Sequence, residues 1–192
     1  QDLLSMVLQS DIEKIRLTLE ELDRDSFEKA VDAIVSARKL YIIGVRSCAA
    51  MATFMSFYFN LIFDNVVKVS ATTASEVFES LLRVGEGDVV IGVSFPRYSS
   101  RTVQAMNFAR SRGATTIAIT DSEVSPLSPI STYTLKARSD MASFVDSLVA
   151  PLSLINALLV AVSRKKNDDL ANTFEDLEKI WEEYGVYEKV QE

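Results

Sequence analysis

The sequence predicts a doubly wound α/β sandwich around a parallel sheet. Short apolar runs alternate with helical patterns four or five times along the chain, which is the order that such folds require. The runs are almost continuously apolar, as strands covered on both faces are. With 192 residues, 48% of them hydrophobic, the chain is long enough to form one domain with a substantial core.

Five apolar runs are expected to form the strands, at residues 39–44, 66–70, 88–94, 115–120 and 133–137. Helical periodicity is expected at residues 3–22, 25–38, 48–63, 74–85, 101–113, 144–163 and 167–185. Asp25 or Ser26 is expected to cap the second helix, and Gly85 and Gly113 to end the 74–85 and 101–113 helices.

The most apolar segment, "FVDSLVAPLSLINALLVAVS", raises the question of a membrane span. Asp146, Pro151 and Asn156 interrupt it, and each is unfavourable in a lipid-exposed helix. We therefore expect a helix that is buried by its own core and by a partner subunit, and no membrane association.

Composition excludes several functions. The chain has 27 acidic and 20 basic residues, so its net charge of −7 disfavours a grip on DNA or RNA by this stretch itself. It has no histidine, which excludes histidine catalysis and histidine metal ligation. Cys48 is the one cysteine, so neither an internal disulfide nor a cysteine zinc site can form, and a cytoplasmic location is expected. We expect no metal and no other cofactor.

Two polar loops follow the first and third predicted strands. "GVRSCAA" provides Arg46 and Ser47, and "SFPRYSS" provides Ser94, Arg97 and Ser99. Guanidinium groups, hydroxyls and the free N–H groups of a helix start suit a phosphate or carboxylate. In a sheet of order 2-1-3-4-5 the ligand crevice lies between strands one and three, so we expect these five residues to converge there. A structural role remains open, with Ser99 as a helix cap and the arginines as surface residues.

Three carboxylates are expected near the crevice, namely Glu76, Glu79 and Asp121. Helix capping or exposure to solvent is the more frequent fate of such residues. Neither glutamate has a partner visible in the sequence that would raise its pKa into a catalytic range. We therefore assign no catalytic residue.

The chain resembles a known family. "YIIGVRSCAA", "GDVVIGVSFPRYSSRT", "GATTIAITDS" with "SPLS", and the apolar "DSLVAPLSLINALL" are similar to the SIS (sugar isomerase) domain, and specifically to that of RpiR-type transcription regulators. The resemblance runs from about residue 27 to residue 166. It implies a three-layer sandwich with a five-stranded parallel sheet of order 2-1-3-4-5 and helices on both faces. It also implies binding of phosphosugars, either as an isomerase or as a sensor.

In RpiR-type regulators a helix-turn-helix domain binds DNA, while the SIS domain detects a phosphorylated sugar or sugar acid and supplies oligomer contacts. By this resemblance residues 1–24 are expected to be a helix and linker from a trimmed regulator, and residues 25–192 the SIS domain. The implied partners are a phosphorylated sugar or sugar-acid effector and a second copy, as a homodimer or tetramer. DNA would be bound only through a helix-turn-helix domain that this chain does not contain.

The sequence departs from the SIS pattern at both loops. The pattern G-x-G-x-S falls on residues 44–48, where Arg46 replaces the second glycine and Cys48 the serine. The pattern S-x-S-G-x-T falls on residues 94–99, where Arg97 replaces the glycine while the outer hydroxyl positions, Ser94 and Ser99, remain. The arginines either bind a more anionic ligand, such as a sugar-acid phosphate, or occupy the phosphate position themselves. We favour the first interpretation because both serines are retained.

Three functions therefore stand. The leading hypothesis is a phosphosugar-sensing effector and oligomerisation domain of a transcription regulator. The first alternative is an aldose–ketose phosphosugar isomerase, in which Glu76 or Glu79 would have to move the proton. The second alternative is an oligomerisation module with a vestigial pocket.

Overall fold

The structure is a computed structural model, and it describes residues 2–140 and 144–188. Its elements follow the predicted alternation along the chain. In order they are α1 (Leu3–Glu21), α2 (Arg24–Val35), β1 (Leu40–Gly44), α3 (Ser47–Ile62), β2 (Val66–Lys68), α4 (Ala74–Ser80), β3 (Val89–Val93), α5 (Ser100–Ser111), β4 (Thr115–Thr120), the 3₁₀ turn η1 (Ser128–Ile130), β5 (Tyr133–Lys136), α6 (Val149–Lys165) and α7 (Asn167–Glu183).

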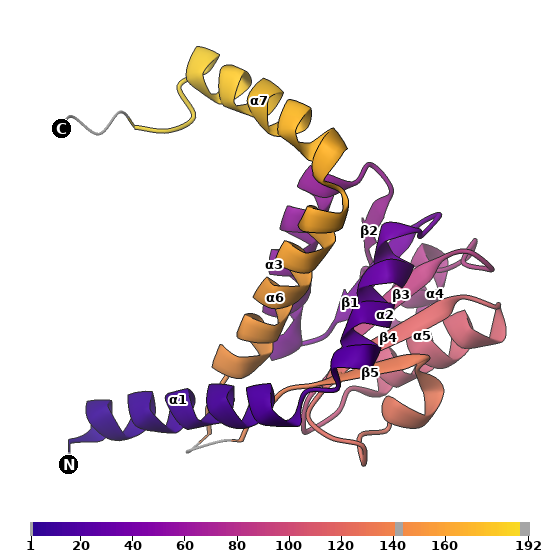
Figure 1. The fold of residues 1–192 in the computed structure, drawn as a ribbon. Coiled ribbons are helices and arrows are strands. Elements are labelled where there is room, and N and C mark those ends of the chain that lie inside the picture. Colours follow the sequence, from indigo (N-terminus) through magenta and orange to yellow (C-terminus); the bar gives the residue numbers. More distant parts are fainter. Residues whose placement is uncertain (1, 141–143, 189–192) are drawn as a thin grey trace.

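The five strands form one sheet in the order β2-β1-β3-β4-β5, and every neighbouring pair is parallel. The predicted fold class and strand order are both confirmed. Helices cover both faces, with α2, α3 and α6 on one side and α4 and α5 on the other (Figure 1). α1 and α7 extend beyond this sandwich on the side of α3 and α6 (Figure 1).

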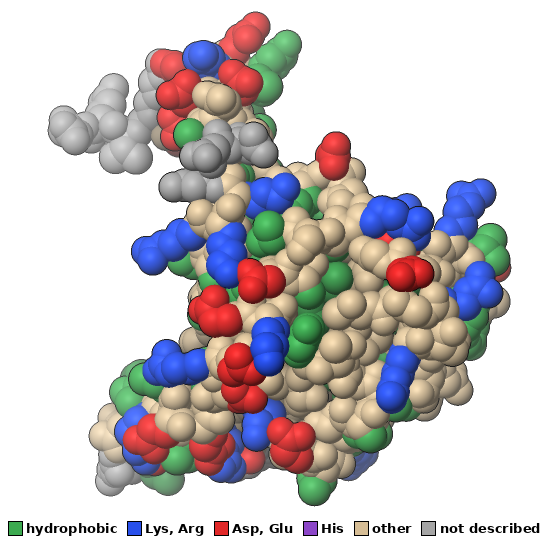
Figure 2. All heavy atoms as spheres, turned by 45° about the vertical axis from the view of Figure 1, so that its right-hand side comes forward, with side chains coloured by type: hydrophobic (Ala, Val, Ile, Leu, Met, Phe, Trp, Pro, Cys, Tyr) green, Lys and Arg blue, Asp and Glu red, His purple; other side chains and the backbone are tan. Residues whose placement is uncertain are grey.

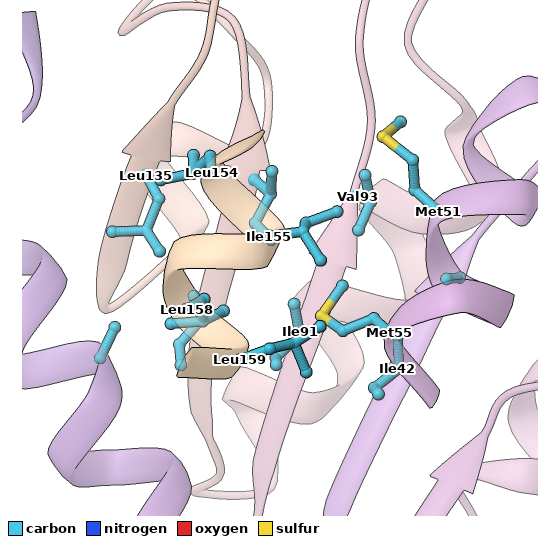
Figure 3. Packing of buried hydrophobic residues seen from close by; sticks show 14 of the residues in the cluster. Ile42, Met51, Met55, Ile91, Val93, Leu135, Leu154, Ile155, Leu158 and Leu159 are labelled. Carbon is cyan, nitrogen blue, oxygen red and sulfur yellow. The ribbon is translucent and has the colours of Figure 1, made fainter. Parts of the chain in front are cut away.

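The central strands β1, β3 and β4 are buried on both faces, which explains their continuous apolar runs. Ile42 and Ile91 point into the cluster beneath α3 and α6, whereas Tyr41 and Val90 point into the cluster beneath α4 and α5. Figure 3 shows the larger cluster, in which Ile155 and Leu159 of α6 lie beside side chains of β3 and α3. Two cores of this kind fix the positions at which the strands end, and so position the loops beyond them.

Some element boundaries differ from the prediction. Asp23, rather than Asp25 or Ser26, caps α2, since its carboxylate accepts from the N–H groups of both residues at 3.1 and 3.2 Å. α4 ends at Ser80, before the expected Gly85, whereas Gly113 follows α5 with a φ of 87° as expected of a stop signal.

The apolar segment at 144–163 becomes a helix only from Val149. Pro151 lacks an N–H and therefore fits best in the first turn of a helix, which places the start shortly before it. Phe144 precedes the helix and is 86% exposed. One face of α6 packs on the sheet and includes Leu154, Ile155 and Leu158, while Asn156 and Val160 are exposed. Among the described residues, we find no helix with both the length and the apolar character that crossing a membrane requires.

Candidate functional site

The β1–α3 and β3–α5 loops begin side by side at the carboxyl edge of the sheet, because Gly44 pairs in register with Val93. Gly44 allows an unusually close approach between β1 and the first turn of α3. A Cβ at this position would lie 2.3 Å from the backbone oxygen of Cys48. The Cys48 thiol is buried and contacts the backbone of Phe95, and burial raises the pKa of this thiol. The two polar loops are therefore in contact through Cys48.

In the β1–α3 loop, Arg46 adopts a backbone conformation that favours glycine, with φ of 59°. Its side chain is exposed, and no carboxylate of residues 2–140 or 144–188 pairs with it. Ser47 is also exposed, and its hydroxyl donates to Asp146 Oδ2 at 3.3 Å. This loop thus presents a free guanidinium group on a strained backbone.

The β3–α5 loop is held by Ser94. This residue is 2% exposed, and its Oγ accepts a hydrogen bond from the N–H of Ser99 at 3.1 Å. Ser99 occupies the N-cap position of α5, yet its side chain makes no capping hydrogen bond. Arg97 is exposed and has no ion-pair partner among the described residues. The loop therefore presents the Ser99 hydroxyl and the Arg97 guanidinium, whereas Ser94 fixes its shape.

Tyr98 is a site residue that the sequence analysis did not single out. Its hydroxyl donates to Asp121 Oδ1 at 2.7 Å and so ties the β3–α5 loop to the residue after β4. Burial, followed by the neighbouring carboxylate, raises the pKa of Tyr98 to about 12. Asp121 does reach this edge of the sheet, as expected, where it accepts the Tyr98 hydroxyl.

A cleft of about 380 Å³ opens between the β1–α3 loop and the segment that follows β2. We refer to it as the β1–β2 cleft. Polar side chains on its walls come from the β1–α3 loop, α3, β2 and the β2–α4 loop, and they are Arg46, Thr53, Lys68, Ser70 and Thr72. Of the five predicted ligand residues, Arg46 alone lines this cleft; Ser47, Ser94, Arg97 and Ser99 lie outside it. The sequence analysis placed the crevice on the β3 side of β1, whereas this cleft lies on the β2 side.

The far wall of the cleft is fixed by Arg101 on α5. Its guanidinium donates to the carbonyl oxygens of Ala71 at 2.8 Å and Thr72 at 2.9 Å, so the β2–α4 loop is tied to α5. Nothing in the sequence distinguishes Arg101 from a surface arginine, because its acceptors are backbone atoms about 30 residues away.

Glu76 has a structural role at the start of α4. It forms a capping box with Thr73, and its Oε2 also accepts from the Ser70 hydroxyl at 3.0 Å. The Ser70 hydroxyl, together with the Thr73 N–H, lowers the pKa of Glu76. A general base for isomerisation needs the opposite change, so this arrangement does not favour catalysis by Glu76. Glu79 is exposed on α4.

Comparison with known proteins gives the family. The model of the SIS domain matches residues 33–161, which is more than half of the chain. The chain belongs to the SIS domain family. Among solved structures, this SIS domain resembles the sugar isomerase domain of an RpiR transcription factor from Sphaerobacter thermophilus, with a TM-score of 0.84 and 28% identity. That match covers 93% of this chain and 99% of the other.

Two other matches are informative. The Vibrio vulnificus NanR protein complexed with ManNAc-6P has the same fold, with a TM-score of 0.80 at 21% identity over 93% of this chain and 70% of that one. An HTH-type transcriptional regulator of Caldanaerobacter subterraneus subsp. tengcongensis is 27% identical over 167 residues, or 85% of this chain and 58% of the regulator. The SIS domain thus spans 58% of the length of that relative. The predicted resemblance to RpiR-type SIS domains is confirmed.

Proposed function

We propose that this SIS domain is the effector domain of a DNA-binding transcription regulator and that its ligand is a phosphorylated sugar or sugar acid. The observation that carries the proposal is that Arg46 and Arg97, on adjoining loops at the carboxyl edge of the sheet, form no ion pair with any residue that the structure describes. Each charge-assisted hydrogen bond contributes roughly 1.5–3 kcal/mol, enough to hold a dianion against the net negative charge of the domain. Acidic and basic side chains are mixed over the face shown in Figure 2, so attraction to an anion depends on these local groups.

The β3–α5 loop is the better candidate for the phosphate. Arg97 and the free Ser99 hydroxyl lie at the start of α5, where the first N–H groups of the helix also point outward. The Ser94 and Tyr98 hydrogen bonds hold this loop in shape before a ligand arrives. Less conformational entropy is then lost on binding.

A chain of contacts links the site to α1. Ser47, the first residue of α3, hydrogen-bonds Asp146, and the next residue after Asp146, Ser147, donates to Asp11 Oδ1 on α1 at 2.6 Å. The end of α1 is held as well, because the N–H of Arg138 donates to Thr18 Oγ1 at 3.0 Å. A ligand that prefers one position of the β1–α3 loop would therefore bias the position of α1. Such a preference shifts the populations of two arrangements, which is how an effector changes DNA binding in a regulator.

Binding can be tested by thermal denaturation of the purified chain with a panel of sugar phosphates and sugar-acid phosphates. At least one compound is expected to raise Tm, because a ligand that binds only the folded state stabilises it. Arg97→Ala should reduce the shift, whereas Arg83→Ala, which removes an exposed arginine from the turn after α4, should leave it unchanged. If no compound raises Tm, the effector proposal fails and the vestigial-pocket alternative gains.

The isomerase alternative can be tested with the same purified chain. Aldose and ketose phosphates can be incubated with the protein and the products separated. We expect no conversion, because Glu76 is committed to the capping of α4. Turnover that disappears in Glu76→Gln would contradict the proposal.

We propose further that a second copy of the chain covers the face formed by α1, α3 and α6. Five apolar residues spaced along α1 are 38–69% exposed, namely Leu4, Leu8, Ile12, Ile15 and Leu19. An apolar groove of about 300 Å³ lies between α3, α6 and Phe174 of α7. The surface area is 11349 Å², about 2,200 Å² above the roughly 9,100 Å² expected for a compact monomer of this mass. Stable dimers bury about 800 Å² or more on each partner, so the excess is sufficient.

Light scattering after size exclusion tests this assembly. The wild-type chain is expected at a multiple of 21.3 kDa. Ile12→Glu should move it toward the single-chain mass, whereas Leu82→Glu, on an exposed leucine in the turn after α4, should not. A single-chain mass for the wild type at micromolar concentration would leave these apolar surfaces to some other partner and contradict self-association.

A further inference from the structure

Two cationic side chains line the β1–β2 cleft. Arg46 lines it from the β1–α3 loop and Lys68 from the end of β2. No carboxylate of the described residues forms an ion pair with either cation. Ser70, another wall residue, donates its hydroxyl to Glu76, and the capping box of α4 also holds this carboxylate. The two cations are therefore free to meet an anion.

The side chain of Lys68 reaches from β2 toward α3. Its Nζ donates to Thr53 Oγ1 on α3 at 3.3 Å, so the ammonium group spans from β2 toward the helix that forms the opposite wall. This contact is long and neutral, and it satisfies one of three ammonium donors. Thr53 and Thr72, both exposed, add hydroxyls to the walls. Such a set of groups suits a carboxylate flanked by sugar hydroxyls.

The cleft and the β3–α5 loop lie on opposite sides of β1. Neighbouring strands are about 4.8 Å apart, so the ends of β2 and β3 are separated by roughly 10 Å with the β1–α3 loop between them. A single phosphate cannot bridge this separation. A six-carbon sugar acid that is phosphorylated at the carbon farthest from its carboxylate has its two charges at opposite ends of the chain, as the two loci require.

We infer that the β1–β2 cleft binds the carboxylate of a phosphorylated sugar acid through Lys68 and Arg46, while the β3–α5 loop binds the phosphate. The inference rests on the proposed function and narrows its ligand class from sugar phosphates to phosphorylated sugar acids. Lys68 is then the residue that determines specificity, because it contacts the group that distinguishes an acid from a neutral sugar. Arg46, between the two loci, contributes to both.

The contribution of the carboxylate to binding can be measured by comparing two compounds. Gluconate 6-phosphate and sorbitol 6-phosphate are open six-carbon chains that differ only at C1, a carboxylate in the first and a hydroxymethyl group in the second. Isothermal titration of the purified chain is expected to show at least roughly tenfold tighter binding of gluconate 6-phosphate, as one charge-assisted hydrogen bond provides. Lys68→Met should bring the two affinities within about threefold, by weakening the binding of the acid alone. Lys179→Met removes the same charge from the exposed surface of α7 and should preserve the preference.

The possible outcomes separate this inference from the proposed function. Equal affinity of the wild type for both compounds overturns the inference and leaves a sugar-phosphate sensor standing. A preference that persists in Lys68→Met overturns the role of Lys68. If other sugar phosphates bind and these two do not, the six-carbon acid is excluded. If no sugar phosphate binds at all, the proposed function falls together with the inference. Circular dichroism melts of both variants confirm that each remains folded.

Discussion

The β1–α3 and β3–α5 loops lie side by side and each carries an arginine, yet different forces hold them in shape. The first depends on backbone geometry, since Gly44 approaches the backbone of Cys48 and Arg46 takes a positive φ. The second depends on side-chain hydrogen bonds, from Ser99 N–H to Ser94 and from Tyr98 to Asp121. The first loop should therefore be sensitive to an added Cβ, and the second to a deleted hydroxyl.

Gly44→Ala is expected to have the largest effect on stability. The new Cβ would lie 2.3 Å from the backbone oxygen of Cys48, a distance that forces β1 and α3 apart. Overpacking of this kind costs about 3 kcal/mol of unfolding free energy, to be measured by urea denaturation. Gly85→Ala is the control, since its Cβ would meet nothing closer than 3.7 Å. Equal losses in the two variants would show that the β1–α3 loop tolerates the added atom.

Tyr98→Phe should have the next largest effect. It deletes a hydrogen bond of 2.7 Å to the Asp121 carboxylate and should lower the unfolding free energy by about 1–2 kcal/mol. Tyr58→Phe is the matched control, because that ring is 42% exposed and its hydroxyl makes no hydrogen bond within the described ranges. A loss no greater than that of the control would mean that the loop holds its shape without this bond.

The wild type and Tyr98→Phe should also differ in how their stability depends on pH. The folded-state pKa of Tyr98 is about 12, above the unperturbed value of 10.0, so the folded state binds the phenolic proton more tightly. The stabilisation is fully present below pH 10 and is lost as the pH rises toward 12. Wild-type stability should therefore fall more steeply than that of Tyr98→Phe across this window, in denaturation series run from pH 9 to 12. Parallel curves would contradict a raised pKa.

The fold could be predicted because its signals are local and repeated. Each of the central strands β1, β3 and β4 is a short apolar run buried on both faces, and the alternation with helices leaves little choice of topology. Element ends were less predictable. Phe144 looks like the start of the apolar helix, but Asp146 and Ser147 use their side chains to contact the β1–α3 loop and α1. Such partners lie 99 and 136 residues away, and periodicity does not encode them.

The candidate cleft coincides only in part with the predicted site residues, for a similar reason. The residue types in the two loops predict a site at the carboxyl edge of the sheet, and Arg46 lines a cleft at that edge. The position of the cleft on the β2 side depends on Lys68, Thr72 and the Arg101 contacts that fix the β2–α4 loop. In the sequence these residues resemble ordinary surface positions. Their common location follows from strand order, which places β2 beside β1 rather than beside β3.

Arg46→Gly should have the smallest effect on stability, and it should raise the unfolding free energy rather than lower it. Glycine adopts a φ of 59° without steric cost, whereas an arginine there is strained by about 1–2 kcal/mol. Part of that gain is offset by the greater entropy of glycine in the unfolded chain, so the variant should be about 0.5–1 kcal/mol more stable than the wild type. Arg46→Ala keeps the Cβ and should show no such gain, and Arg97→Gly, where φ is not positive, should be slightly destabilised.

The stability and ligand affinity of the Arg46 variants together also test whether the strained backbone at Arg46 serves ligand binding. If Arg46→Gly is more stable but binds gluconate 6-phosphate less tightly, the strain is retained for the sake of the ligand, as positive-φ residues at binding sites often are. If Arg46→Ala and Arg46→Gly have the same stability, the backbone of this loop is unstrained and relaxes around either residue. The side chain of Arg46 would then be the whole of its contribution, and the two loops would differ less than their conformations indicate.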